Sequence, residues 1–286
     1  MHDFPTFLNI PLSEWIDAVM NWLLDTFGTF FDVIGHGMLM LLLYIERFFL
    51  WLPWWFVILA VVVACWRVMD KWWHALVMAA MLFLIGTFGY WELAMMTLGL
   101  TTAAVIVSLA VGLPTGILMA KSDIVESITK PILDAMQTMP SFVYLIPALM
   151  FFGLGKVPAL IATLIYAVPP VIRLTNVGIR QVPQSVLEAA RAFGASPRQI
   201  LFEVEIPLAI PSIMVGINQT TMMALAMVVI ASMIGARGLG LEVLLAINRI
   251  EIGRGFEAGI CIVFLAIIID RLTTALATRR QETQKS

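Results

Sequence analysis

The 286-residue chain is 61% hydrophobic and only 13% charged, and its formal net charge is −2. A soluble domain is closer to about 45–50% apolar and about 25% charged, so this composition predicts an integral membrane protein. Its long continuous apolar runs favour spanning helices over the short alternating segments of a membrane β-barrel. Cys65 and Cys261 lie in apolar runs and the three histidines are scattered, so no metal or redox site is expected.

The N-terminal region, residues 1–50, has a different pattern from the rest of the chain. Within residues 11–31, four polar residues recur at helical spacing opposite tryptophans and other apolar residues: Glu14, Asp17, Asn21 and Asp25. This pattern predicts an amphipathic helix lying in the membrane interface. Residues 33–50 are apolar but contain three ionisable residues: His36, Glu46 and Arg47. These favour a second interfacial or re-entrant helix over a full span.

The remaining sequence predicts an all-α membrane protein with a five-helix core and two additional spans before it. The additional pair occupies residues 51–90, with helices at 53–69 and 74–90. The core occupies residues 91–280, and residues 281–286 form a short tail. The expected core spans are 91–120, 132–153, 157–174, 207–235 and 255–277. Because a span needs about 20 apolar residues, the proline-containing second and third spans must be kinked or packed against neighbours.

The basic residues predict the orientation of these spans. If the spans alternate in direction, most Lys and Arg residues fall on one side: Arg67, Lys71, Lys121, Lys130, Arg173, Arg180, Arg191, Arg198, Arg279, Arg280 and Lys285. The positive-inside rule makes this side cytoplasmic, which places the C-terminus inside and the N-terminus outside. Three arginines fall on the other side, beside Glu242, Glu251 and Glu257: Arg237, Arg249 and Arg254.

A polar segment at residues 183–199 separates two of the apolar runs. Ser185 with Glu188 predicts one capping box, and Ser196 with Gln199, with Pro197 at the first helical position, predicts a second. Gly194 falls where a left-handed residue would end the first helix. We therefore expect a short helix at about 186–193, a sharp turn, and a second helix that enters the membrane.

This segment resembles the cytoplasmic coupling loop of importer-type ABC permeases. The pattern is Glu188-Ala189-Ala190, three residues, Gly194, nine residues, Val204, one residue and Ile206-Pro207. The family has Ile and Leu-Pro at the last positions, so Val204 and Ile206 are conservative departures. The resemblance implies that the coupling loop, residues 181–205, docks on an ATPase through six residues: Glu188, Ala189, Ala190, Arg191, Gly194 and Arg198. The alternative is an ordinary helix–turn–helix connection between spans.

Further segments resemble the glycine-betaine/proline-betaine (or choline) importers. They are Leu133–Leu145, Val168–Arg173, Gly216–Gln219, Ala226–Ala236 and Gly238–Gly240. One departure is Arg237, where many relatives have Pro. The resemblance implies the type I ABC importer permease fold and a homodimer in the lipid membrane. It also implies two cytoplasmic ATPase subunits and an extracytoplasmic substrate-binding protein as partners. No Gly-rich phosphate loop is present in the sequence, so ATP and Mg are expected on the ATPase, with no cofactor, enzyme activity or nucleic acid assigned to this chain.

Ten residues are candidates for the translocation pathway or its gate: Met136, Gln137, Met139, Pro140, Tyr144, Asn218, Gln219, Met227, Met233 and Gly238. Aromatic rings and thioethers could pass a quaternary ammonium group without trapping it, and Pro140 frees a backbone carbonyl. Core or lipid packing and hydrogen bonds between helices or subunits explain these residues equally. Gly235, Gly238 and Gly240 suggest a flexible turn, and Asp134 could pair with Arg173.

Two other functions remain open from the sequence. An ion-coupled secondary transporter would need ionisable groups within its spans, whereas the acidic residues here cluster at the predicted helix ends. A membrane assembly or scaffold protein would leave the coupling loop without a role.

Overall fold

The computed structural model describes residues 11–68 and 72–285, the last ten of them by their backbone, and every regular element in these ranges is helical. Within these ranges, five helical segments are long and apolar enough to cross a membrane, or six if a bent pair described below counts as one span: Leu12–Trp51, Trp91–Lys121, Lys156–Arg180, Pro197–Ala226 and Ile252–Ala275. The all-α class predicted from composition is confirmed. Asp70 and Lys71, which the sequence placed between two spans, lie outside the described residues.

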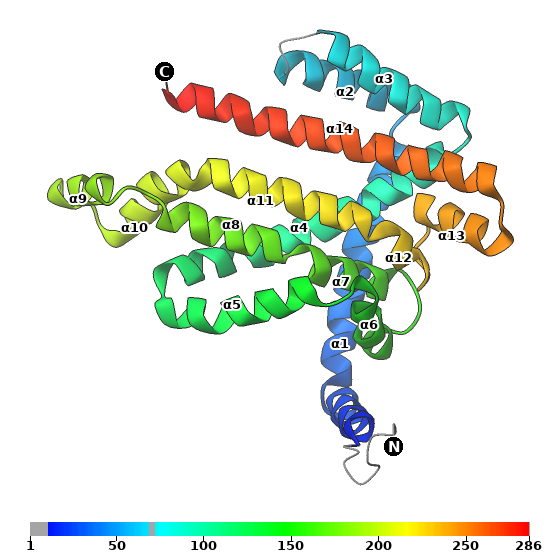
Figure 1. The fold of residues 1–286 in the computed structure, drawn as a ribbon, viewed down its shortest axis with the longest axis horizontal. Coiled ribbons are helices and arrows are strands. Elements are labelled where there is room, and N and C mark those ends of the chain that lie inside the picture. Colours follow the sequence, from blue (N-terminus) through cyan, green and yellow to red (C-terminus); the bar gives the residue numbers. More distant parts are fainter. Residues whose placement is uncertain (1–10, 69–71, 286) are drawn as a thin grey trace, which may run out of the picture.

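The centre of the molecule is a set of helices that run lengthwise in Figure 1. They are α4 (Trp91–Lys121), α7 (Lys156–Ala167) continued by α8 (Pro169–Arg180), α11 (Ile206–Ala226) and α14 (Ile252–Lys285). Helix α9 (Gln184–Ala192) lies at one end of this bundle and α13 (Leu239–Arg249) at the other. We refer to these as the α9 end and the α13 end. The predicted tail is helical as far as Lys285.

Helix α8 is held between α4 and α11 by glycines that allow close approach. A Cβ atom on Gly112 of α4 would lie 2.4 Å from Val171 Cγ1 of α8, and one on Gly116 would lie 2.6 Å from Thr175 Cβ. On the other side, a Cβ atom on Gly216 of α11 would lie 3.1 Å from the Val171 Cα. Small residues at helix contacts are the usual means of close packing in membranes.

Replacing Gly116 with alanine is therefore expected to destabilise the chain by about 2 kcal/mol, because overpacking forces the helices apart. Thermal unfolding of the purified chain in detergent measures this loss. The control is Gly259→Ala on α14, where an added Cβ atom meets nothing within 4 Å. That change should leave stability equal or slightly higher, since Ala favours helix over Gly. Equal losses in the two variants would contradict close α4–α8 packing.

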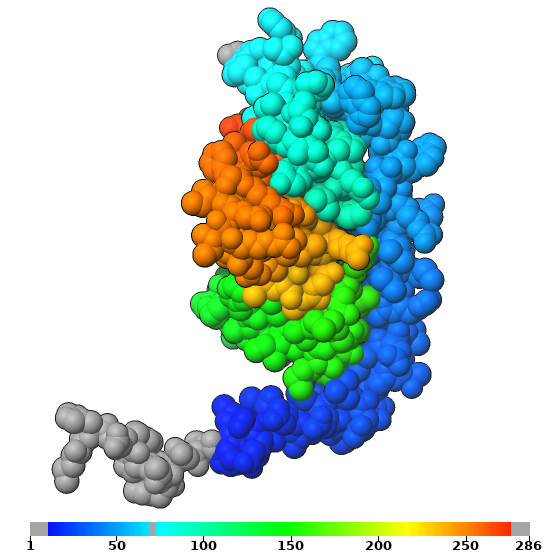
Figure 2. All heavy atoms as spheres, turned by 90° about the vertical axis from the view of Figure 1, so that its right-hand side faces the viewer, coloured from blue at the N-terminus to red at the C-terminus, as the bar shows by residue number. Residues whose placement is uncertain are grey.

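The N-terminal region forms one helix, α1 (Leu12–Trp51), where the sequence predicted two. Forty residues span roughly 60 Å, about twice the thickness of a bilayer's hydrocarbon core. Helix α1 runs crosswise to α11 and α14 in Figure 1, and Figure 2 shows it along one side of the molecule. A membrane crossed by those helices would have α1 lying along its plane. The interfacial position of residues 11–31 stays a prediction.

The second half of α1 packs on the bundle as part of the same helix, whereas the sequence predicted a second interfacial or re-entrant helix at residues 33–50. The Lys156 ammonium, at the start of α7, lies 2.7 Å from both carboxylate oxygens of Glu46. Helix α4 approaches closely at the same place, because a Cβ atom on Gly99 would lie 3.0 Å from the Glu46 Cα. The ion pair of Glu46 and Lys156 therefore attaches α1 to α7, and the charge of Glu46 does not prevent its burial.

The two additional helices are present as α2 (Trp54–Val68) and α3 (Trp72–Thr87). They pack on each other, with the sulfur atoms of Cys65 and Met78 3.0 Å apart, and lie beside α14 (Figure 1). Their described parts comprise 15 and 16 residues, and even with the three residues between them the pair averages fewer than the roughly 20 residues of an ordinary span.

The predicted span 132–153 is broken into two helices. Helix α5 (Asp123–Thr138) begins nine residues earlier than expected, because the Ser122 hydroxyl accepts a hydrogen bond from the Val125 amide and caps it. A 3₁₀ turn, Ser141–Tyr144, follows Pro140, and α6 (Leu145–Phe152) then leaves at a bend of 111°. Proline and the extended backbone around it explain the break.

The segment after α11 is more ordered than the expected flexible turn. A short helix, α12 (Val228–Ser232), precedes Gly235 and Gly238, which have φ angles of +107° and +148°. Gly240 lies inside α13 (Leu239–Arg249), a helix that the sequence analysis missed. A Cβ atom on Gly240 would lie 2.5 Å from the Val228 carbonyl oxygen, so this glycine serves close packing of α12 on α13.

Candidate coupling site and pathway residues

The coupling loop projects from the bundle at the α9 end (Figure 1). Val182 and Ile200 are buried at its two ends, and every residue between them is exposed or half-buried. After α9, the short α10 (Pro197–Gln199) leads through a π-helical turn, Ile200–Glu205, into α11. The helix–turn–helix predicted from sequence is therefore present, on a stem that is packed into the molecule.

The turn between α9 and α10 follows the predicted chemistry in part. Gly194 has a φ of +80°, and the Ala195 amide donates to the Ala190 carbonyl at 3.1 Å, which closes α9 in the expected left-handed manner. The Ser196–Gln199 capping box is also confirmed, with both of its hydrogen bonds present. The first capping box is wrong: α9 begins at Gln184 after Pro183, so Ser185 lies inside its first turn.

The predicted docking residues form an open surface on this loop. Glu188, Ala189, Arg191, Gly194 and Arg198 are exposed, and Ala190 is half-buried. Phe193, at the end of α9, is 93% exposed. From the sequence, residue 193 was predicted only as the last residue of the short helix. Aromatic residues are enriched at protein–protein contacts and among the residues that contribute most to binding.

Ion pairs fix the stem of the coupling loop to the bundle. Glu205, buried in the π-helical turn, pairs with Lys121 at the end of α4. Arg180, the last residue of α8, pairs with Asp123 at 2.8 Å and Glu126 at 3.0 Å at the start of α5. These residues were not predicted as part of the site. The sequence did contain one signal for them, because Glu205 is a carboxylate at the edge of an apolar run.

The structure places the ten pathway candidates at different depths, with Met136 and Asn218 half-buried and Gly238 buried. Five are exposed: Gln137, Met139, Pro140, Gln219 and Met233. Met227 is fully buried among core residues and Tyr144 is 5% exposed. The buried positions favour the packing interpretation, whereas a pathway role for the exposed ones stays a prediction.

Tyr144 compensates for the helix break at Pro140. A proline at position 140 cannot donate to the carbonyl of Met136, four residues earlier. The Tyr144 hydroxyl donates a hydrogen bond to this carbonyl instead. In the same region Arg173 of α8 pairs with Asp134 of α5 at 2.5 Å, which confirms the predicted ion pair.

Asn218 forms hydrogen bonds to a neighbouring helix. The sequence had left this alternative open beside a role in the pathway. Its side-chain amide donates to Asp270 of α14 at 2.8 Å, and its carbonyl oxygen accepts from the Thr273 hydroxyl at 2.5 Å. Asp270 was missed by the sequence analysis, although an isolated carboxylate within an apolar span is a signal of function. The group joins α11 to α14 away from the helix ends.

The α13 end contains a second polar group. The Thr97 hydroxyl of α4 accepts a hydrogen bond from the Leu239 amide at 2.9 Å, beside Gly238, where a Cβ atom would lie 2.6 Å from that hydroxyl. Arg254 pairs with Glu242 at 2.5 Å. Burial raises the pKa of the nearby Tyr90, and the charges of Glu242 and Glu257 raise it further. Across residues 11–68 and 72–275, no three His, Cys, Asp or Glu side chains form a group that could hold a metal.

A bundle of helices long and apolar enough to cross a membrane, with an exposed helix on a fixed stem at one end, defines an integral membrane protein. The profile of the family described as binding-protein-dependent transport system inner membrane component matches residues 112–282. The chain therefore belongs to this family, whose members are transport permeases. The match covers the coupling loop and the helices α8, α11 and α14.

Curated relatives match over nearly the whole chain. The glycine betaine/carnitine transport permease protein GbuB of Listeria monocytogenes is 48% identical, over 95% of this chain and 97% of the relative. The glycine betaine/proline betaine permease ProW of Escherichia coli is 44% identical, over 93% and 75%. The glycine betaine permease OpuAB of Bacillus subtilis is 43% identical, over 95% and 96%.

A solved structure shares the fold. A chain of the MetNI methionine ABC transporter in an inward facing conformation superposes with a TM-score of 0.58 at 21% identity, covering 65% of this chain and 93% of that one. At this identity the likeness concerns the fold alone. The predicted type I ABC importer permease fold is thus confirmed.

Proposed function

We propose that this chain is the membrane-spanning subunit of an ATP-driven importer that carries a quaternary-ammonium osmolyte: glycine betaine, proline betaine or choline. The observation that supports the mechanism is the exposed α9 on its ion-paired stem. In this mechanism a partner ATPase binds α9, and the energy of ATP hydrolysis reaches the bundle through this helix. The substrate class rests on relatives that are named as betaine permeases and are 43–48% identical over almost the full chain.

The proposal includes the partners and the orientation. Two copies of the chain form the pathway, and an ATPase subunit that holds ATP and Mg docks on each α9. Lys121 ends α4, Arg180 ends α8, and Arg191 and Arg198 lie in α9 and α10. These elements meet at the α9 end (Figure 1), which supports a cytoplasmic position for this end and for the C-terminus. The α13 end then faces the extracytoplasmic substrate-binding protein. The site of hydrolysis is outside this chain.

Reconstitution tests the function directly. Vesicles that contain the chain with its ATPase, and binding protein outside, should accumulate labelled glycine betaine only when ATP is enclosed. A protonophore should not reduce this uptake. Uptake without ATP, or none with any of the three osmolytes, would contradict the proposal. Omission of the chain is the control for leakage through the vesicle.

Asp270 gives one observation in favour of an ion-coupled secondary transporter. Its carboxylate lies within the apolar helix α14 and is hydrogen-bonded by Asn218, which is the kind of group such transporters use. The same vesicles distinguish the two functions. Under the importer proposal, the Asp270→Asn variant keeps an ATP requirement and stays insensitive to the protonophore. A secondary transporter would lose gradient-driven uptake in this variant.

A further inference from the structure

A cavity of about 390 Å³ lies between the start of α2, the end of α3 and the start of α4. It is lined by seven residues: Trp54, Ile58, Leu82, Phe83, Gly86, Thr87 and Trp91. We propose that this cavity binds the acyl chain of a membrane phospholipid, whose glycerol-ester region accepts hydrogen bonds from the Trp54 and Trp91 indoles. The α2–α3 pair would then be attached to the bundle partly through a bound lipid.

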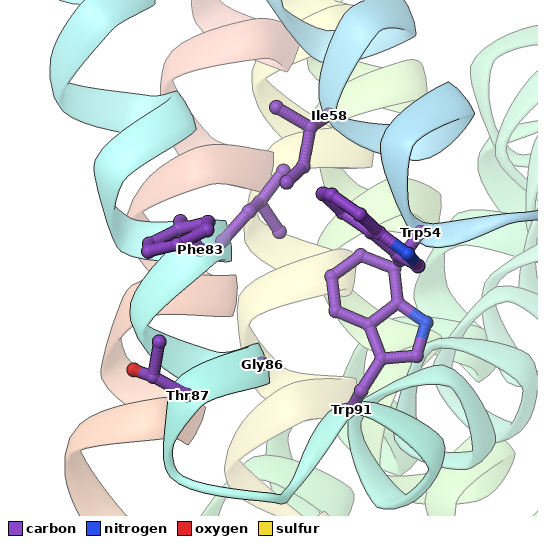
Figure 3. Close-up of a pocket in the computed structure, with 7 residues that line it drawn as sticks. Trp54, Ile58, Phe83, Gly86, Thr87 and Trp91 are labelled. Atoms are coloured by element: carbon purple, nitrogen blue, oxygen red, sulfur yellow. The ribbon is translucent and has the colours of Figure 1, made fainter.

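The shape of the cavity follows from Gly86 on α3. A Cβ atom built there would point toward the Trp91 ring and lie 3.9 Å from its Cε3 atom. The missing side chain therefore leaves room beside the indole. Figure 3 shows Trp54 and Trp91 together on one side of the space and Phe83 on the other, with Ile58 above. The volume falls within the range of about 300–1,000 Å³ typical of sites for small ligands.

The uncharged residues that line the cavity favour an apolar ligand. None of the seven residues is charged, and the Thr87 hydroxyl already donates to the Leu84 carbonyl at 2.9 Å. An ion or a zwitterion would enter such a space without a counter-charge, at a high desolvation cost. The two indole N–H groups remain as donors, and Figure 3 shows their nitrogen atoms on the same side of the cavity. One apolar chain with acceptors at its head fits this arrangement.

The cavity lies at the ends of three apolar helices. In a membrane, this is the level where the acyl chains of the lipids meet their headgroups. Trp54 opens α2, Thr87 ends α3 and Trp91 opens α4, so the cavity lies at the boundary of three apolar helices on the α13 end. Exposed Trp51 and Trp55 lie next to it in the chain. Tryptophans gather at this level because the ring is apolar and the N–H group finds polar partners there.

The length of α2 and α3 gives a reason for a bound lipid. Residues 54–87 number 34 with the connection included, which averages 17 per helix or roughly 26 Å at 1.5 Å per residue, against about 30 Å for the hydrocarbon core. Lipids around such a short pair must adjust to the mismatch. A cavity at the end of the pair accepts a chain that would otherwise meet the polar helix ends.

The test counts phospholipids retained by the full-length chain. The protein, reconstituted in vesicles of phosphatidylethanolamine and phosphatidylglycerol, is extracted into mild detergent and analysed by native mass spectrometry. The Gly86→Leu variant fills the cavity and should retain one phospholipid fewer per chain than the wild type. The control is Ala80→Leu, which adds the same side chain at an exposed position of α3 and should retain as many as the wild type.

A second variant tests the polar contact without filling the space. Trp54→Phe combined with Trp91→Phe keeps an apolar lining and removes both N–H donors, so the lipid should be lost earlier during detergent washing. Equal retention by the wild type and Gly86→Leu, both eluting as folded protein, would overturn the proposal. Displacement of the retained lipid by millimolar glycine betaine would also overturn it, since the aromatic rings would then be a site for the cation.

Discussion

Replacing Phe193 with serine is expected to reduce betaine uptake at least tenfold while the chain remains folded in the membrane. Phe193 is 93% exposed at the end of α9, and aromatic residues in such positions commonly contribute about 2 kcal/mol or more to an interface. A loss of 2 kcal/mol weakens binding by about thirtyfold. Co-purification with the ATPase subunit, measured beside uptake in vesicles, reports this loss.

The control for this change is Phe48→Ser, which removes an exposed phenylalanine of α1, outside the coupling loop. It should leave the ATPase bound and uptake nearly normal. A companion variant, Gly194→Val, places a β-branched residue at a φ of +80°. This strain should misdirect α10 and weaken the ATPase complex as well. If Phe193→Ser bound the ATPase as tightly as the wild type, α9 would not be the docking helix.

Replacing Lys156 with methionine should destabilise the chain by about 3–5 kcal/mol. The Glu46 carboxylate is 9% exposed and its partner ammonium 26%, so the substitution leaves a buried negative charge without compensation. We expect a lower midpoint of thermal unfolding in detergent. Loosening of α1 from α7 should make the chain more susceptible to limited proteolysis in α1.

A double-mutant cycle separates the lost charge pair from lost packing. The variant with methionine at both position 46 and position 156 should recover most of the stability, because two apolar side chains can replace a buried pair at little cost. Lys130→Met, at an exposed position of α5, is the control and should change stability by less than about 1 kcal/mol. A double variant no more stable than Lys156→Met alone would contradict this account.

The sequence could predict α4, α11 and α14 because each is a long apolar run, a signal that depends on composition alone. It could not predict the continuity of α1. The ionisable residues His36, Glu46 and Arg47 suggested a second, separate helix, but Glu46 is neutralised by Lys156, 110 positions away in the chain. Helix α13 was missed because its start, at Gly238–Gly240, has the composition of a turn, and only packing against α12 reveals a helix.

The coupling loop was more predictable than the pathway for a physical reason. Its turn chemistry is local: Gly194, Ser196 and Gln199 determine the shape of the loop through hydrogen bonds to near neighbours. The exposure of Phe193 and the burial of Met227 depend instead on which helices pack against them. A pathway between two copies also needs the second chain, so single-chain patterns of methionine and aromatic residues could not separate lining from core.

The glycine contacts that hold α8 between α4 and α11 have a mechanical consequence. Side chains and backbone interlock at Gly112, Gly116 and Gly216, so these three helices resist sliding past one another. Force applied at α9 would then move them as one stiff block. The nearest point of reduced stiffness is the start of α8, toward the α13 end, where Pro169 and Pro170 lack the amide donors of an unbroken helix. A push at the α9 end would thus bend the helices close to the α13 end, where the proposed function places the binding protein that delivers the solute.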